Sequence, residues 1–170
     1  MTIVTETGSE PVSVAEAKAV ALIDTDADDT ELGYLITTAR RMVEYYINSD
    51  ILPKQRKYYM PYVTDGVLLL PFAPVDTLDS VVVGSITYAS DQYDVFGTTN
   101  SQIDFGFDAQ NVTVTYTTSG ATPDQQVKEA IKAVVEYLYN SQGVIETNDL
   151  PKSMPRHIKK MLIGQKNVYF

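Results

Sequence analysis

The stretch LLLPFAPVDTLDSVVV, residues 68–83, contains two short apolar runs separated by a proline-bounded turn. The first run ends at Pro71, and Pro74 leads into the second run, which extends from Leu78 to Val83. Short runs of Leu and Val bounded by proline are typical of β-strands. By itself the stretch predicts only a strand, a turn and a second strand. Its significance comes from its position between two helical regions.

Similar runs continue on both sides of this stretch and define a β insertion at residues 53–118. Gly, Asp, Asn and Ser separate the runs at nearly regular intervals, a pattern that indicates an antiparallel sheet or a small β-sandwich. The expected strands are Gln55 to Tyr62, Val67 to Leu70, Leu78 to Val83, Tyr93 to Phe96, Ser101 to Phe105 and Val112 to Thr117.

A pair of helices is expected before the β insertion, within residues 11–50. Ser13 and Glu16 have the spacing of a capping box, in which each residue binds a backbone N–H of the other. Strong helix formers follow these residues, and together they predict a short helix from about Val14 to Ile23.

The aspartate-rich segment DTDADDTE, residues 24–31, is expected to join this helix to the next. A calcium-binding loop would need glycine at its sixth position and glutamate at its twelfth, and this segment has neither. We expect Asp28 or Asp29 to cap the second helix instead. Apolar residues at helical spacing then predict an amphipathic helix from about Asp29 to Asn48.

The helical pattern returns after the β insertion. Thr122 followed by Pro, Asp and Gln125 has the sequence of a second capping box, with Thr122 as N-cap of a helix within residues 122–142. A short basic helix is expected from Ser153 to Leu162. Together the elements predict an α+β fold in which the N-terminal helix pair and the C-terminal helices pack with a central antiparallel sheet. By its length the chain is expected to form a single domain.

Composition argues against several classes of function. The chain of 170 residues contains no cysteine and one histidine, so it cannot have a disulfide, a thiolate zinc site or a cysteine nucleophile. Serine-hydrolase and phosphate-binding motifs are absent. Asp76 and Asp79 are a conceivable acid–base pair, but solvated turn residues are the expected reading. We therefore expect no enzyme activity, no metal and no cofactor.

Charge is distributed unevenly along the chain. The formal net charge of −9 argues against a protein whose main function is to grip DNA, and it is compatible with a surface that repels DNA or with simple solubility. Residues 151–170 have the opposite character, since they contain basic residues and no Asp or Glu. Such asymmetry often marks a segment with its own partner. No apolar run is long enough to span a bilayer and no signal peptide is evident, so we expect no membrane contact.

The order of the elements resembles the head–tail connector proteins of tailed phages, also called adaptor or head-completion proteins. No single motif is specific, but the ordered set covers about residues 11–140. The segments that carry the resemblance are PVSVAEAK (11–18), the aspartate turn (24–29), the helix Leu32 to Tyr45, LPFAPVDTLDSV (70–81), VTVTY (112–116) and Pro123 to Ile131. The chain departs from the family pattern in two ways: it runs longer than a minimal member, with a basic C-terminal extension, and residues 91–109 have no counterpart.

The resemblance implies a structural protein of the virion neck, assembled in the host cytoplasm. Family members form a homo-oligomeric ring, often of twelve copies, beneath the portal, and DNA passes through the ring without specific binding. A stopper or tail-completion protein binds below. A family C-terminal segment inserts into the portal, which makes the basic tail the expected portal contact. The residues proposed for it are Lys152, Arg156, Lys159, Lys160, Lys166, Tyr169 and Phe170.

Subunit contacts are expected on the second helix, where Arg40 and Arg41 lie beside Tyr45 and Tyr46. A salt bridge from the arginine pair to a neighbouring subunit is one interpretation, and a solvated pair is the alternative. The tail is either a portal contact or a disordered end, so deleting residues after Pro151 should leave folding intact. The competing functions are another neck or tail-completion protein, a non-enzymatic binding module, or an enzyme with an unrecognised carboxylate site.

Overall fold

The computed structural model describes residues 1–72, 74–97, 101–141 and 154–166. These residues form two compact units. The β unit comprises residues 1–8 and 52–121, and the helical unit comprises residues 9–51, 122–141 and 154–166. The chain is mixed α+β, as the sequence predicts.

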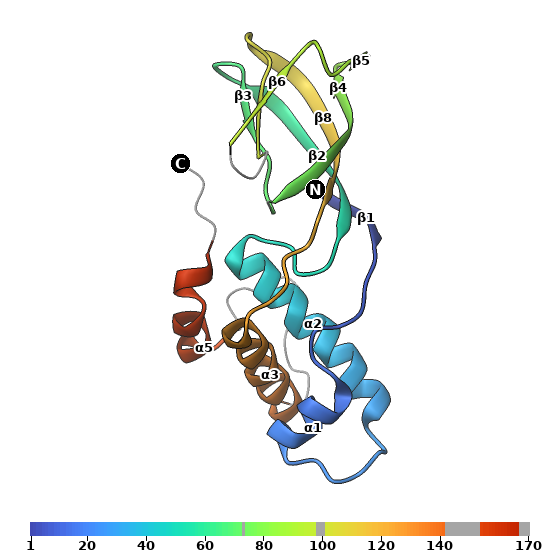
Figure 1. Cartoon of the computed structure of the whole chain (residues 1–170), viewed down its shortest axis with the longest axis vertical. Helices are drawn as coiled ribbons and strands as arrows, with labels where there is room; N and C mark the ends of the chain where they lie inside the picture. The colour runs from blue at the N-terminus through green and yellow to red at the C-terminus, as the bar shows by residue number, and fades with distance from the viewer. Residues whose placement is uncertain (73, 98–100, 142–153, 167–170) are drawn as a thin grey trace. The chain divides into compact units, whose positions relative to one another are not determined.

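The β unit contains two antiparallel sheets (Figure 1). The larger sheet has five strands, in the order β1 (Thr2–Glu6), β2 (Lys54–Val63), β8 (Ala109–Thr118), β4 (Val75–Val83) and β5 (Ile86–Tyr88). The smaller sheet has three, in the order β3 (Val67–Leu69), β7 (Gln102–Asp104) and β6 (Asp94–Phe96). The long strand β8 pairs with both β2 and β4 and is therefore the central strand of the larger sheet.

The stretch at residues 68–83 forms the predicted strand, turn and strand, but its two strands enter different sheets. β3 pairs with β7, whereas β4 pairs with β8 and β5. At the turn, Phe72 adopts a left-handed φ of 62°, and the Arg56 guanidinium lies 3.8 Å from the centre of its ring. A cation over an aromatic face is favourable, and it fixes the turn that separates the two sheets.

Two strands were not expected from the sequence. β1 is too close to the N-terminus to show a full alternating pattern, and it pairs with β2 at the edge of the larger sheet. β5 has only three residues and follows β4 through a turn at Gly84, whose φ is 62°. In addition, β4 begins at Val75 and not at Leu78, so Asp76 and Asp79 lie within a strand and not in turns as predicted.

The helical unit contains α1 (Val14–Ala21), α2 (Asp29–Ile47), α3 (Gln125–Asn140), α5 (Arg156–Met161) and the short 3₁₀ helix η2 (Ile163–Gln165). The predicted capping box at the start of α1 is confirmed. The Ser13 N–H donates to the Glu16 carboxylate at 2.8 Å, and the Glu16 N–H donates to the Ser13 hydroxyl at 3.2 Å. Within the described residues, no helix has the length and apolar character needed to cross a bilayer.

The predicted cap of α3 at Thr122 is wrong. Asp124 is the N-cap, and its carboxylate accepts the Val127 N–H at 2.8 Å. Pro123 precedes the cap, so it cannot serve in the first turn. Asp28 does occupy the N-cap position of α2, but its side chain makes no capping bond. It accepts the Tyr139 hydroxyl of α3 at 2.8 Å instead, which ties the two helices together.

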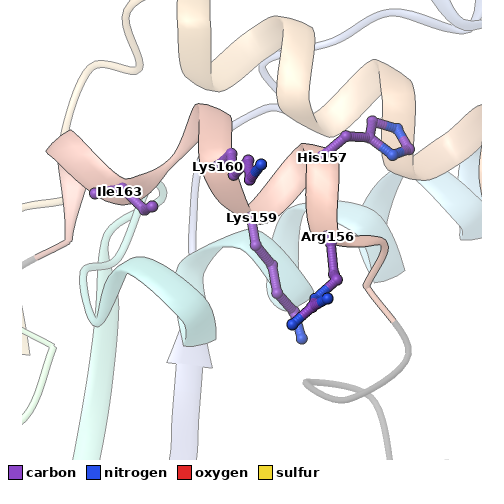
Figure 2. A pocket seen from close by; sticks show the side chains of 5 residues that line it. All are labelled: Arg156, His157, Lys159, Lys160 and Ile163. Atoms are coloured by element: carbon purple, nitrogen blue, oxygen red, sulfur yellow. The ribbon is translucent and has the colours of Figure 1, made fainter.

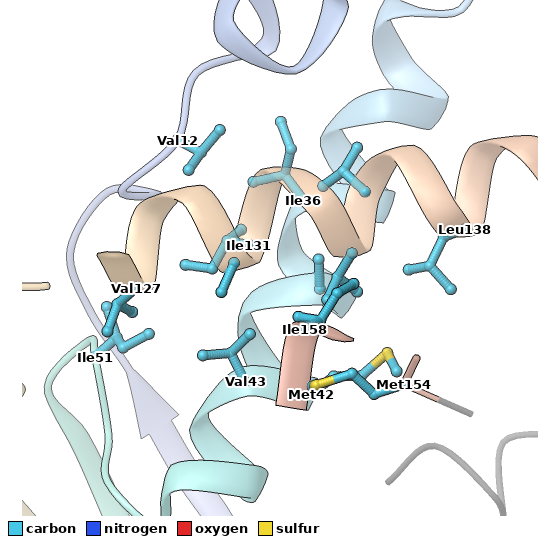
Figure 3. Packing of buried hydrophobic residues seen from close by; sticks show 14 of the residues in the cluster. Val12, Ile36, Met42, Val43, Ile51, Val127, Ile131, Leu138, Met154 and Ile158 are labelled. Carbon is cyan, nitrogen blue, oxygen red and sulfur yellow. The ribbon is translucent and has the colours of Figure 1, made fainter. Parts of the chain in front are cut away.

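One apolar cluster fills the helical unit (Figure 3). It includes Ile36 and Val43 from α2, Ile131 from α3, and residues of the C-terminal segment. Ile158 and Leu162 are fully buried, and Met154 is 2% exposed. The expectation of a tail whose removal leaves folding intact is therefore wrong for residues 154–166, because apolar side chains of this segment complete the core.

Candidate interaction surfaces

The C-terminal helix α5 presents a basic face. Lys159 and Lys160 follow Arg156 by three and four residues, a spacing that places the three side chains on one side of the helix, and Ile163 lies just beyond its end. They line, with His157, an open hollow of about 660 Å³ (Figure 2). Figure 2 shows Arg156 and Lys159 extending in the same direction, with His157 directed away from them.

The opposite side of α5 makes this face rigid. Ile158 and Leu162 anchor the helix in the apolar cluster. Two amide side chains add polar contacts near the end of the segment, since Gln165 donates to the Asp124 carboxylate at 2.7 Å and Gln126 donates to the Met161 carbonyl. The basic side chains therefore stand on a helix that is already folded and docked.

Of the other predicted portal-contact residues, the structure describes Lys166. Lys152, Tyr169 and Phe170 lie outside the described residues. The Lys166 ammonium lies 5.6 Å from the centre of the Tyr46 ring, within the range of a cation–π contact. Lys166 and Tyr46 were predicted for two different contacts, and the fold brings them together.

Arg40 lies in the interior of the helical unit. Its side chain is fully buried between two carboxylates, with Nε 2.7 Å from Glu10 and Nη1 3.0 Å from Glu44. Glu44 also accepts the Ile51 N–H at 2.9 Å. A salt bridge from Arg40 to a neighbouring subunit does not fit this burial. Glu10 precedes Arg40 by 30 residues, so no local pattern could have revealed the pairing.

A stripe on α2 consists of the exposed residues Tyr34, Arg41 and Tyr45 and the half-buried Thr38. Their spacing of four, three and four residues follows one face of the helix. Tyr34 is 71% exposed and Tyr45 is 61% exposed, and Arg41 is also exposed. Two of these residues, Arg41 and Tyr45, were predicted as subunit contacts. Tyr34 was missed, although its spacing from Arg41 would have identified it.

The turn between α1 and α2 is held by Lys18. The Lys18 ammonium bonds the carboxylates of Asp26 and Asp29, the latter at 2.8 Å. These hydrogen bonds raise the pKa of Lys18 and the bond from Lys18 lowers the pKa of Asp26. At the end of α1, Leu22 adopts a left-handed φ of 56° and is 87% exposed. A fixed turn thus presents a large apolar side chain to solvent.

The outer face of the β unit carries Asp79, which is surrounded by neutral donors. Gln55, Thr77 and Thr117 donate hydrogen bonds to its carboxylate at 2.9, 2.8 and 2.9 Å. Burial tends to raise the pKa of Asp79, but these hydrogen bonds outweigh it and the pKa lies below its usual value.

Asp76 lines a separate small pocket of about 310 Å³ with Tyr93. Among the described residues, no three His, Cys, Asp or Glu side chains form a group that could hold a metal.

Comparison with known proteins gives a family match and a fold match. A family model described as "Head completion protein" matches residues 10–168. None of the curated proteins matches the chain in sequence.

Solved structures of similar fold include chains from three neck or virion particles. A chain of the "Neck of empty GTA particle computed with C6 symmetry" is 15% identical with a TM-score of 0.68. A chain of the "Virion of native gene transfer agent (GTA) particle" is 14% identical with a TM-score of 0.68. A chain of the "Neck of native GTA particle computed with C12 symmetry" is 14% identical with a TM-score of 0.59. Each match covers 100% of this chain and 97% of the other.

Proposed function

Because this chain belongs to the head completion protein family, we propose that it is a structural, non-enzymatic subunit of a virion neck that joins the capsid to the tail. The observation that carries the proposal is the family match over residues 10–168, which spans both the helical unit and the β unit. The neck particles named for the structures of similar fold support the same location.

We further propose that the subunits form a homo-oligomeric ring of twelve copies. The structures of similar fold come from necks computed with C6 and C12 symmetry, which supports a cyclic arrangement. In a head-to-tail ring each subunit uses two different surfaces, one for each neighbour. Arg41, Tyr45 and Tyr46 are our candidates for one of them, because Tyr and Arg are enriched at protein interfaces. Arg40 is no longer a candidate, because it is fully buried.

The proposed portal contact is the basic C-terminal segment. Arg156, Lys159 and Lys160 line an open hollow on a helix anchored in the core. An acidic portal surface would complement this face, and binding would not require the helix to fold first. Lys152, Lys166, Tyr169 and Phe170 complete the proposed contact.

The charge distribution supports passage of DNA without tight binding. All 22 Asp and Glu residues precede residue 151, where they outnumber the Lys and Arg of the same region, so most of the chain repels phosphate. We propose that DNA crosses the ring centre on its way to the tail, and that a stopper or tail-completion protein binds the opposite side.

The test is the mass of the protein in solution, measured by light scattering alone and with purified portal protein. A complex of portal and a ring of this chain supports the proposal. A charge-reversed variant, Lys159→Glu with Lys160→Glu, should lose portal binding while an Asp76→Asn control retains it. A chain that enters particles without contacting portal would instead be another neck or tail-completion protein. A persistent monomer that ignores portal and never enters particles would contradict the neck role altogether.

A further inference from the structure

Leu22 is the most exposed of the large apolar side chains in the described part of the chain, at 87%. It is not loosely held. The N–H groups of Leu22 and Ile23 both donate to the Lys18 carbonyl, and Ile23 packs against the apolar cluster. The left-handed backbone at this position would suit glycine, and a leucine there is strained. Neither burial within its own unit nor backbone preference explains a leucine at this position.

The surroundings of Leu22 are acidic. Asp24 and Glu31 are exposed, while Asp26 and Asp29 are bound by Lys18. Lys18 thereby joins the end of α1 to the start of α2. Leu22 therefore projects from a rigid turn with a carboxylate two residues away. We call Leu22 and Asp24 the acidic knob.

The surface that complements the acidic knob is the stripe on α2. Within residues 9–51 and 122–141, Arg41 is the only Lys or Arg side chain that is exposed, and the others are half-buried or buried. The Tyr45 ring, one turn further along, offers an exposed aromatic surface. Tyr34 lies at the other end of the same stripe. The Arg41 guanidinium complements the Asp24 carboxylate in charge, and the tyrosine rings beside Arg41 offer an apolar surface that suits Leu22.

The acidic knob and Arg41 belong to different parts of the helical unit. Lys18 ties the turn that carries the knob to Asp29, the first residue of α2, and Arg41 lies 12 residues beyond Asp29, which corresponds to about 18 Å along the helix axis. Two different patches on one chain give a heterologous contact, and repeated rotation closes such contacts into a ring.

From this geometry we propose that the acidic knob of one subunit docks on the α2 stripe of a second copy, with Leu22 against Tyr45 and the Asp24 carboxylate paired with Arg41. The proposal rests on the ring of the proposed function and names the residues that close it. Charge complementarity selects the second copy as the occupant. The competing site for an acidic knob, the basic face of α5, becomes an outcome of the test.

Disulfide trapping tests the contact directly, because the chain contains no cysteine of its own. The double variant L22C/Y45C is oxidised both alone and in a mixture with portal, and each sample is analysed on a denaturing gel. We expect a ladder of covalent multimers, since each subunit would link to both neighbours, whereas either single variant should give no ladder. A disulfide needs Cβ atoms within about 4.5 Å, so the ladder reports close contact.

The matched control pairs L22C with I163C, which places the second cysteine at the α5 face. A ladder from L22C/I163C and none from L22C/Y45C overturns the proposal in favour of α5 as the receiving surface. Absence of any ladder in a complex that binds portal also overturns it, and leaves the proposed function intact. A ladder without portal binding supports the subunit contact and counts against the portal role.

Variants separate the contact from folding. Leu22→Gly relieves the left-handed strain and removes the knob, so the variant should fold at least as stably as the natural chain but assemble at least tenfold more weakly. Ile86→Gly removes another exposed apolar side chain, on the β unit, and should leave assembly unchanged. Arg41→Asp should weaken assembly and Asp24→Arg should restore it in the double variant. Full assembly by Leu22→Gly, or failure of the charge swap to restore assembly, would contradict the pairing.

Discussion

Replacing Ile158 by alanine should destabilise the helical unit, whereas the same replacement at Ile163 should not. Ile158 is fully buried on the inner side of α5, and Ile163 is 65% exposed just beyond the end of the same helix. Both residues are isoleucines and they lie only five positions apart. A difference in stability between the two variants therefore reports the difference in burial.

The size of the effect follows from the burial. Truncating a fully buried isoleucine to alanine removes apolar contacts and leaves a cavity, which together cost about 3 kcal/mol. Met154 and Leu162, which lie beside Ile158, are also anchored in the core and should not move to fill the cavity. Ile158→Ala should therefore show most of this loss of stability. For Ile163 the change should stay within about 0.5 kcal/mol, as is usual for exposed positions.

Urea unfolding followed by far-ultraviolet circular dichroism provides the measurement, since the signal reports helix. With a denaturant dependence of about 2 kcal/mol per molar urea, the midpoint for Ile158→Ala should fall by about 1.5 M. The midpoint for Ile163→Ala should be unchanged. Equal stability of the two variants would show that α5 is not docked in the core, and the rigid basic face proposed for the portal contact would then have no basis.

Three further predictions concern charges and caps. Arg40→Met should cost about 3 kcal/mol in urea unfolding, because it leaves the buried Glu44 carboxylate without its partner, while Arg41→Met should cost less than about 0.5 kcal/mol. Asp124→Ala should cost about 1 kcal/mol of stability by removing the cap of α3, whereas Thr122→Ala should have almost no effect. Because the pKa of Asp79 is lowered in the folded chain, its hydrogen-bonded carboxylate stabilises the fold above the ordinary aspartate value of about 3.9. The stability difference from Asp79→Asn should therefore be present at neutral pH and disappear as the pH falls through the lowered value, as unfolding measured across acidic pH would show.

The long helix and the approximate positions of most strands could be read from the sequence because they depend on local patterns. Apolar residues at helical spacing define α2, and the capping box at Ser13 is complete within four residues. The cap of α3 was misplaced because Thr122 and Asp124 are both good caps, and a pattern does not decide between adjacent candidates. β1 was missed because an edge strand obtains its order from its pairing with β2, about 50 residues away in sequence.

The candidate surfaces were predicted less completely, and the reason is burial. The sequence places Arg40 and Arg41 side by side, but only the fold decides that one is enclosed by Glu10 and Glu44 while the other is exposed. A short basic helix was predicted within the C-terminal segment, and α5 lies within the predicted range, but the docking of that helix in the core was missed because its charge is more obvious than its apolar side. Its apolar side, Ile158 and Leu162, has the spacing of one helix turn, yet six helical residues are too few to be stable alone. Tertiary packing determines that this helix forms.

The docked state of α5 changes how a portal contact would work. A disordered basic tail would lose conformational entropy on binding, and that cost would reduce its affinity. A helix already anchored by Ile158 and Leu162 presents Arg156, Lys159 and Lys160 with little further ordering. Its attraction for an acidic surface remains screened by salt, because these side chains line an open hollow at the surface. The contact should therefore form readily at low ionic strength and depend on apolar neighbours such as Ile163 to persist at higher salt.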